Sequence, residues 1–286
     1  MNMKTSEERT YALGHSKQEL ERLSRQGRAF APYTRQLLIE AGITPGMRVL
    51  DIGCGSGDIA FLAADIVGNS GEVVGVDRAA AAVEWAKARA SARGAHNVSF
   101  VVGDPACMEF PHEFDAIVGR LVLMYYPDPV HALANLIRHL RPAGVTIFQE
   151  FDIANCRSHP CSPLFDRSVD LIKRTLSATG ARTQLGLELY AVFADAGLPG
   201  PSMRMDSLIG GGRDIIAYEL VAEVIQTLLP VMEKLGIATA SEIDVATLPR
   251  RMSEEVVSLQ GVVLSPGLIG AWSRKPAQFT APVVNA

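Results

Sequence analysis

The sequence predicts an α/β fold built on a doubly wound, mostly parallel β-sheet. Short apolar runs alternate with helical segments from residue 48 to residue 152. Strands of this kind are typical of a sheet whose two faces are both covered by helices. The connection at residues 53–57 contains three alternate glycines, which let a backbone adopt positive φ and come close to a ligand. A chain of 286 residues, 48% of them hydrophobic, can bury a large core.

The first part of the chain reads as a helical arm followed by a regular alternation. Ser16 and Glu19 have the spacing of a capping box, and Pro32 is expected to start a second helix. The elements expected next are strand Arg48–Ile52, helix Asp58–Val67, strand Val73–Asp77, helix Ala79–Arg93, strands Val98–Val102 and Phe114–Arg120, helix Pro129–Leu140 and strand Val145–Asp152.

Beyond residue 152 the alternation gives way to longer helical stretches. Proline at the first helical position predicts a helix from Pro163 to near Gly180. The remaining expectations are helix Glu188–Ala196, strand Ser202–Leu208, helix Asp214–Leu235 with a kink or break at Pro230, a helix at about Ile243–Leu259, and a final strand Leu268–Ser273.

The three glycines lie between two parts of a nucleoside-binding unit. The first strand ends in Asp51 and Ile52, the turn contains Gly53, Gly55 and Gly57, and Asp77 closes the next strand. A strand, a glycine turn, a helix and an acid that accepts from the ribose hydroxyls make such a βαβ unit. The turn amides and the helix N-terminus suit a carboxylate. The spacing G-x-G-x-G, in place of G-x-G-x-x-G, favours S-adenosylmethionine over NAD.

At this turn the chain resembles the class I S-adenosylmethionine-dependent methyltransferases. The segment from Phe114 to Pro129 looks like small-molecule enzymes of the quinone-biosynthesis type. The resemblance implies a Rossmann-like, seven-stranded, mostly parallel sheet with a reversed final strand and helical lid insertions. It also implies S-adenosylmethionine as cofactor, S-adenosylhomocysteine as product, and in-line methyl transfer to a small apolar or amphipathic metabolite.

The same resemblance divides the chain into parts. Residues 1–44 would form the arm or part of a lid, and residues 45–154 the cofactor-binding core. Residues 155–274 would complete the core and carry lid insertions at about 155–185 and 212–260. Residues 275–286 would be a loose tail.

The resemblance also assigns roles to individual residues. Asp104 would accept from the adenine amino group, the stem of Arg78 would pack on adenine, and Tyr11 and Gln26 would close over the methionine end. The cofactor-binding set expected is Tyr11, Gln26, Asp51, Gly53, Gly55, Gly57, Asp77, Arg78, Asp104, Pro105 and Arg120.

A general base is needed only if the acceptor must lose a proton during attack. Glu150, at the end of a predicted strand, and His15, in the arm, are the catalytic candidates, and Tyr125 and His159 are assigned to the substrate pocket. Glu150 is equally readable as an acid that supports its neighbours or as a solvated acid.

Composition narrows the class of protein. A net charge of −4 and the lack of a dense basic run argue against a nucleic-acid partner. The polar N-terminus does not resemble a secretory signal, and no apolar run is long enough to span a membrane, so we expect a cytoplasmic protein. Cys156, His159 and Cys161 fall short of the ligand pairs of structural zinc sites, so no metal is expected.

Three alternatives stay open from the sequence. An NAD-dependent oxidoreductase would share the βαβ unit but needs a glycine at another offset and a hydride-transfer acid, neither of which we find. A protein that binds S-adenosylmethionine without transferring its methyl group would carry the same pattern. A methyltransferase acting on protein or RNA is the third alternative. Apolar helices at residues 214–259 offer a face for a homodimer.

Overall fold

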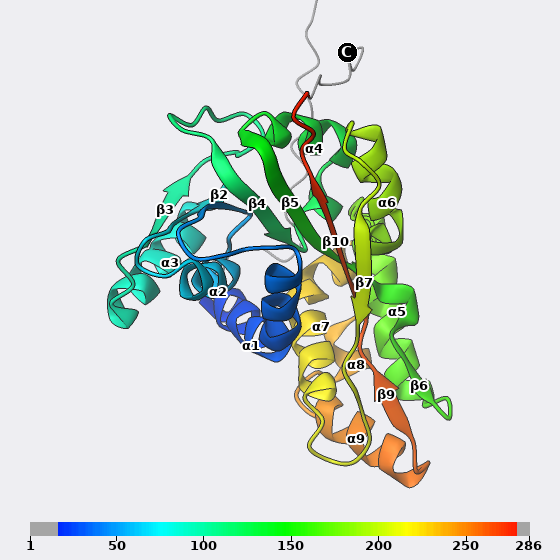
Figure 1. Cartoon of the computed structure of the whole chain (residues 1–286). Helices are drawn as coiled ribbons and strands as arrows, with labels where there is room; N and C mark the ends of the chain where they lie inside the picture. The colour runs from blue at the N-terminus through cyan, green and yellow to red at the C-terminus, as the bar shows by residue number, and fades with distance from the viewer. Residues whose placement is uncertain (1–16, 279–286) are drawn as a thin grey trace, which may run out of the picture.

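The computed structural model describes residues 17–278 and contains a seven-stranded sheet with the order β3-β2-β1-β4-β5-β10-β7 (Figure 1). Strand β10 runs antiparallel to both of its neighbours, and the other pairs are parallel. The strands are β1 Arg48–Ile52, β2 Glu72–Asp77, β3 Val98–Val102, β4 Phe114–Arg120, β5 Leu140–Asp152, β7 Ser202–Asp206 and β10 Gly267–Arg274. The predicted fold class, with its one reversed strand, is confirmed.

Helices cover both faces of the sheet, as the unbroken apolar strands require. One face is covered by α1 Lys17–Glu40, α2 Asp58–Val67 and α3 Ala80–Arg93, and the other by α4 Pro129–Ile137 and α6 Leu185–Asp195 (Figure 1). Alternate residues of β1 serve the two layers. Val49 packs with Phe61 of α2, whereas Leu50 packs with Leu133 and Phe193 of α4 and α6.

A third layer, which we call the lid, lies against the carboxyl ends of the parallel strands (Figure 1). Its own core contains fully buried Phe165, Ile225 and Met252. The lid consists of α5 Pro163–Ala178, α7 Ile216–Lys234, α8 Ala240–Ile243, α9 Leu248–Ser258 and a small sheet of β6 Arg157–His159, β9 Val262–Leu264 and β8 Ile209–Gly210. Two short 3₁₀ helices, Leu123–Tyr125 and Ile153–Asn155, follow β4 and β5.

Two helices run through prolines at which the sequence predicts a new helix start, at Pro32, and a kink or a break, at Pro230. Helix α1 is continuous across Pro32, and α7 is continuous across Pro230. An interior proline costs a helix about 3 kcal/mol. In α7, Leu228 and Met232 on either side of Pro230 are both fully buried. Packing of one continuous apolar face on each helix outweighs that local cost, so tertiary structure overrides the signal in the sequence.

One further prediction about the lid is wrong in detail, and one feature was missed. The helix expected at about 243–259 begins only at Leu248, with Pro249 in its first turn, because Asp244, with a positive φ of 48°, ends the preceding short helix α8. The small sheet was not predicted at all. Its strands have two or three residues each, too few to show the alternation that identifies a strand.

No helix within residues 17–278 is both long enough and apolar enough to cross a membrane.

Helix α6 offers a matched pair of leucines for testing the core. The side chain of Leu189 is fully buried in the layer between α6 and the sheet, whereas Leu187 is 58% exposed. We expect Leu189→Ala to lower the free energy of unfolding by about 2–5 kcal/mol, because it leaves a cavity, and Leu187→Ala to change it by no more than about 0.5 kcal/mol. Urea denaturation followed by circular dichroism measures both, and equal effects would contradict this packing.

Candidate active site

A cavity of about 670 Å³ lies between the carboxyl ends of the strands, the lid and α1. Strand β1 has β2 on one side and β4 on the other, so the order of the sheet reverses between β1 and β4. Ligands of open α/β sheets bind outside the carboxyl ends at such a reversal. The cavity therefore occupies the position that the topology favours.

The glycine turn forms one wall of the cavity. Gly53, Gly55 and Gly57 have φ values of 61°, 50° and 83°, in the region that other residues rarely adopt. A Cβ atom at Gly53 would lie 2.4 Å from Val122 Cγ2, whereas one at Gly55 would have Leu23 Cδ1, 3.9 Å away, as its nearest neighbour. The backbone at Gly55 thus borders open space that a side chain would fill, beside the N-terminus of α2.

Asp77, at the end of β2, fixes this turn. Its Oδ2 accepts the Gly55 backbone N–H at 2.9 Å, and its Oδ1 accepts the Ala79 N–H at 2.9 Å. Each carboxylate oxygen can accept a second hydrogen bond. The half-buried carboxylate lines the cavity, so it combines a structural contact with free acceptor capacity.

Arg120, at the end of β4, brings a positive charge to the floor of the cavity. Its Nη1 donates to Thr34 Oγ1 at 3.0 Å, and Thr34 donates to Gln149 Oε1 at 2.7 Å, which ties α1 to β4 and β5. Burial lowers the pKa of Arg120, and the nearby Asp58 and Asp51 carboxylates oppose that shift. Burial raises the pKa of Asp51 to about 8, although the Arg120 guanidinium acts to lower it. Asp51 lies behind the cavity wall, below the turn, and is almost fully buried.

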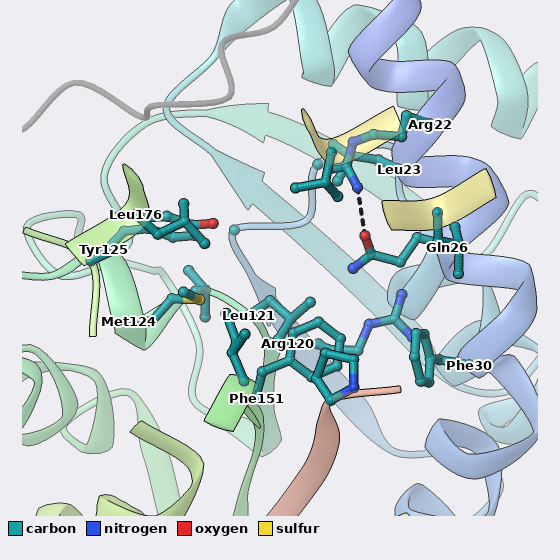
Figure 2. Close-up of a pocket in the computed structure, with 18 of the residues that line it drawn as sticks. Arg22, Leu23, Gln26, Phe30, Arg120, Leu121, Met124, Tyr125, Phe151 and Leu176 are labelled. Carbon is teal, nitrogen blue, oxygen red and sulfur yellow. Dashed lines mark hydrogen bonds between the residues drawn. The ribbon is translucent and has the colours of Figure 1, made fainter. Parts of the chain in front are cut away.

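Helix α1 forms a second wall, which Figure 2 shows through Arg22, Leu23, Gln26 and Phe30. Arg22 Nη1 donates to Gln26 Oε1 at 2.6 Å. The sequence predicted Gln26 at the site and missed the other three. Their spacing over residues 22–30 places them on one face of a helix, which is the only sequence pattern that could have identified them. Any helix face packed in a core has the same spacing, so the pattern does not indicate a cavity.

The lid supplies an apolar half to the cavity. Helix α5 contributes a stripe of Phe165, Val169, Ile172 and Leu176, at intervals of three or four residues. The other apolar wall residues are Leu121, Met124, Phe151, Ile153, Leu208, Ala217, Leu220, Val221, Val224 and Pro266. Figure 2 places Met124, Tyr125 and Leu176 across this space from α1, whereas the Phe151 ring lies 5.5 Å, centroid to centroid, from that of Phe30 on α1. Sequence reasoning expected an apolar pocket here but did not identify these residues.

Glu150 lies outside the cavity wall and serves the loop after β4. Its carboxyl group is fully buried, and its Oε1 accepts the backbone N–H groups of Val122 at 3.0 Å and Leu123 at 2.7 Å. Burial raises its pKa to about 8, and the hydrogen bonds from these two amides oppose the shift. Of the roles that the sequence leaves open for Glu150, this geometry favours the supporting one.

The remaining predicted residues are only partly brought together. Tyr11 and His15 fall outside the described residues. Tyr125 and Pro105 line the cavity, whereas His159 is exposed on β6, outside the cavity wall. Asp104, beyond β3, is beside the wall, and its Oδ1 accepts the Ala106 N–H at 3.0 Å.

The cysteines near His159 do not gather into a cluster. Cys156 is buried and lines the cavity, where burial raises the pKa of its thiol to about 12, whereas Cys161 is exposed. Within residues 17–278 no three His, Cys, Asp or Glu side chains are grouped so that they would hold a metal ion.

Residues 43–196 match a family model described as "Methyltransferase domain". Aklanonic acid methyltransferase DauC of Streptomyces sp. (strain C5) is 39% identical over 120 residues, which are 42% of this chain and 54% of that protein. The ubiquinone/menaquinone biosynthesis C-methyltransferase UbiE of Francisella philomiragia is 30% identical over 140 residues, 48% of this chain and 54% of that protein. The chain thus spans about half the length of each of these relatives.

The fold also has solved counterparts. The crystal structure of the YcgJ protein from Bacillus subtilis superimposes with a TM-score of 0.54 at 18% sequence identity, covering 85% of this chain and 98% of that one. At this identity the likeness concerns the fold alone.

The buried Glu150 makes stability depend on pH. Below its ordinary pKa of 4.5 the carboxyl is protonated in both the folded and the unfolded chain. Between about 4.5 and about 8 only the unfolded chain releases the proton, so a rise of one pH unit lowers the free energy of unfolding by up to about 1.4 kcal/mol. Glu150→Gln keeps an oxygen acceptor and removes this titration. We therefore expect the stability of the variant, relative to the wild type, to increase from about pH 5 to about pH 8.

Urea denaturation of both proteins at several pH values measures this difference. Glu84→Gln, at an exposed carboxylate on α3, is the control and should leave the pH profile unchanged. A Glu150→Gln profile parallel to that of the wild type would contradict a protonated Glu150 in the folded protein.

Proposed function

Because this chain belongs to the methyltransferase-domain family, whose methyl donor is S-adenosylmethionine, we propose that it transfers that methyl group to a small apolar or amphipathic metabolite. The observation that carries the proposal is the continuity of the cavity. Its polar half, at the glycine turn, and its apolar half, under the lid, belong to one space. A polar cofactor and an apolar acceptor can therefore meet inside it.

The residues of the polar half fit the cofactor. The open backbone at Gly55 and the N-terminus of α2 suit the amino-acid carboxylate, to which the Arg120 guanidinium adds a positive charge. Asp77 retains acceptor capacity for the two ribose hydroxyls. Gln26 and Gly53 complete the amino-acid end, with Gly57 and the buried Asp51 supporting the turn from outside the cavity wall, and Arg78, Asp104 and Pro105 form the adenine end. Tyr11, outside the described residues, remains a proposed closing residue.

Alignment is the main contribution that the chain makes to the transfer. When bound, the cofactor supplies a methyl group already activated on a sulfonium sulfur. The apolar walls exclude water and hold the acceptor against the polar half, and such positioning can supply several kcal/mol of the rate enhancement, about 7 or more in the best-oriented systems. Glu150 positions the Val122 and Leu123 backbone between the two halves.

The described walls of the apolar half contain no carboxylate and no imidazole. Cys156 stays a thiol at neutral pH, because its pKa is about 12. We therefore keep Tyr125 as the residue that contacts the acceptor, and His15, outside the described residues, as the proposed base for acceptors that need one. The exposure of His159 gives it no part in this proposal.

The apolar half also bears on the rival functions. Relatives whose names include aklanonic acid methylation and ubiquinone/menaquinone biosynthesis support a small organic acceptor. The oxidoreductase alternative finds no support in the family match or in the glycine spacing. A protein that binds the cofactor without transfer is the second candidate, since its binding residues would be the same.

Location and assembly are further parts of the proposal. We propose a cytoplasmic protein that does not bind nucleic acid, in line with its net charge of −4. A homodimer also remains a proposal. Much of the apolar surface at 214–259 is buried within the lid. A dimer face there would therefore use the exposed apolar residues of this stretch, such as Ile216 and Leu235.

Asp77 tests the cofactor assignment. We expect Asp77→Ala to weaken the binding of S-adenosylmethionine at least about tenfold, because hydrogen bonds to a charged acceptor contribute about 1.5–3 kcal/mol each. Asp77→Asn keeps one oxygen acceptor, so its affinity for S-adenosylmethionine should lie between those of the wild type and Asp77→Ala. Isothermal titration calorimetry measures the dissociation constants, with NAD titrated in parallel and expected to give no heat of binding.

Thermal melting of the two variants checks that the glycine turn survives the loss of its Asp77 contacts. NAD binding as tight as that of S-adenosylmethionine, or cofactor binding that ignores Asp77, would overturn the assignment.

Ile172 tests the apolar half. The neutral probe N-phenyl-1-naphthylamine fluoresces in apolar sites, and we expect the wild type to bind it. Ile172→Asp places a carboxylate on the apolar wall, so probe affinity should fall at least about tenfold while S-adenosylhomocysteine still binds. Arg174→Asp introduces the same group on the exposed side of α5 and should change neither. Equal probe binding by all three proteins would contradict an acceptor site under the lid.

A further inference from the structure

The nucleoside end of the cavity is lined by Asp77, Arg78, Ala79, Pro105 and Tyr126. An adenine base presents an amino donor at C6 and two acceptor nitrogens, N1 and N7, that flank this amino group on the edge of the base. A protein that reads this edge needs an acceptor and a donor side by side, as an Asn or Gln amide provides for adenine in DNA. The acceptor here is Asp104, which leaves the donor to be identified.

Several backbone amides at this end are unable to serve. Pro105 has no N–H group, the Ala106 N–H donates to Asp104 Oδ1 at 3.0 Å, and the Ala79 N–H donates to Asp77 Oδ1 at 2.9 Å. The Gly103 N–H bonds the Asp77 carbonyl at 2.9 Å. Among the described residues of this wall, Arg78 and Tyr126 carry the side-chain donors.

The Arg78 guanidinium is held next to the acceptor. Its Nη2 donates to Asp104 Oδ2 at 2.5 Å, and its Cζ lies 5.0 Å from the centroid of the Tyr126 ring. The Tyr126 hydroxyl is 3.5 Å from Asp104 Oδ1, and burial, with the Asp104 carboxylate, raises the pKa of this phenol, so it stays protonated. Only one of the five N–H groups of Arg78 is needed for the ion pair.

We propose that Arg78 reads the cofactor base: its guanidinium donates a hydrogen bond to N1 or N7, the ring nitrogens that flank the 6-amino group, while Asp104 accepts from that amino group. The inference rests on the proposed function and deepens it, because it identifies a specificity-determining residue within the same site. The charged side chain takes over a contact that the backbone at Pro105 is unable to make.

A purely structural role for the ion pair is a poor explanation. The Arg78 side chain is 58% exposed and that of Asp104 28% exposed, and ion pairs at such positions add little to stability. Loss of the guanidinium therefore leaves the fold intact and acts on ligand binding alone.

The test is a cycle of ligand and protein changes measured by calorimetry. S-adenosylhomocysteine and its 1-deaza and 7-deaza analogues, in which C–H replaces N1 or N7, are titrated into the wild type and Arg78→Met. The methionine keeps an apolar stem and has no donor. We expect one of the two analogues to bind the wild type about tenfold more weakly than S-adenosylhomocysteine does, and Arg78→Met to bind all three ligands alike.

Two further variants sharpen the result. Arg93→Met removes a partly exposed guanidinium on α3 and should reproduce the wild-type pattern. Arg78→Lys retains a donor and should restore part of the discrimination. Circular dichroism confirms that each variant is folded.

The outcomes separate the two claims. A wild type that binds S-adenosylhomocysteine but discriminates against neither analogue, or discriminates as strongly after Arg78→Met, overturns the role of Arg78 and leaves the proposed function standing. A folded wild type that binds none of the three ligands overturns the proposed function, and this inference with it.

Discussion

The reversal of strand order between β1 and β4 is the constraint on which the site depends. At this point the connections leave the sheet on opposite faces, so the carboxyl ends of the central strands stay uncovered. The glycine turn, Asp77 and Arg120 all follow strands at this edge. Asp77 holds two of these segments together, because its carboxylate accepts hydrogen bonds from the Gly55 amide in the connection after β1 and from the Ala79 amide in the connection after β2. The lid can then be built from any sequence that presents an apolar surface to the opening.

The cavity separates charge from apolar surface along its length. Charged side chains gather at the end formed by the sheet and α1, whereas the walls under the lid come from aliphatic and aromatic residues. A carboxyl group placed near the boundary, Glu150, is buried and turned toward backbone amides. The cost of burying it is reduced because it takes a proton more readily than an exposed glutamate does. Protonation thus keeps Glu150 from placing a negative charge beside the apolar half of the cavity.

The sequence predicted the elements whose signals are local. Strands β1, β3 and β4 and helix α2 have the bounds expected from apolar runs and the glycine turn, and their alternation predicts a mostly parallel sheet, whereas the reversed final strand was expected from the family resemblance. Features that depend on distant contacts were missed. The continuity of α1 and α7 through proline comes from packing, and the small lid sheet pairs segments that are far apart in the chain. Of the residues that line the cavity, Asp77, Gly53 and Gly55 were predictable from spacing. Arg22 and Phe30 were not, because a helical stripe does not reveal whether it faces a core or a cavity.

Helix α1 belongs by sequence to an N-terminal arm outside the cofactor-binding core, yet it forms part of the cavity. Its N-terminal half contacts the lid, where Arg25 pairs with Glu223 at 2.8 Å and Glu19 accepts from Thr227 at 3.1 Å. Further along, Thr34 bonds Arg120 and Gln149 in the body of the sheet. Between these anchors, Gln26 and Phe30 line the cavity. One rigid element therefore sets the distance between the apolar and polar halves. Because the proposed methyl transfer depends on alignment more than on acid or base chemistry, that distance is the quantity that the proposal requires this fold to control.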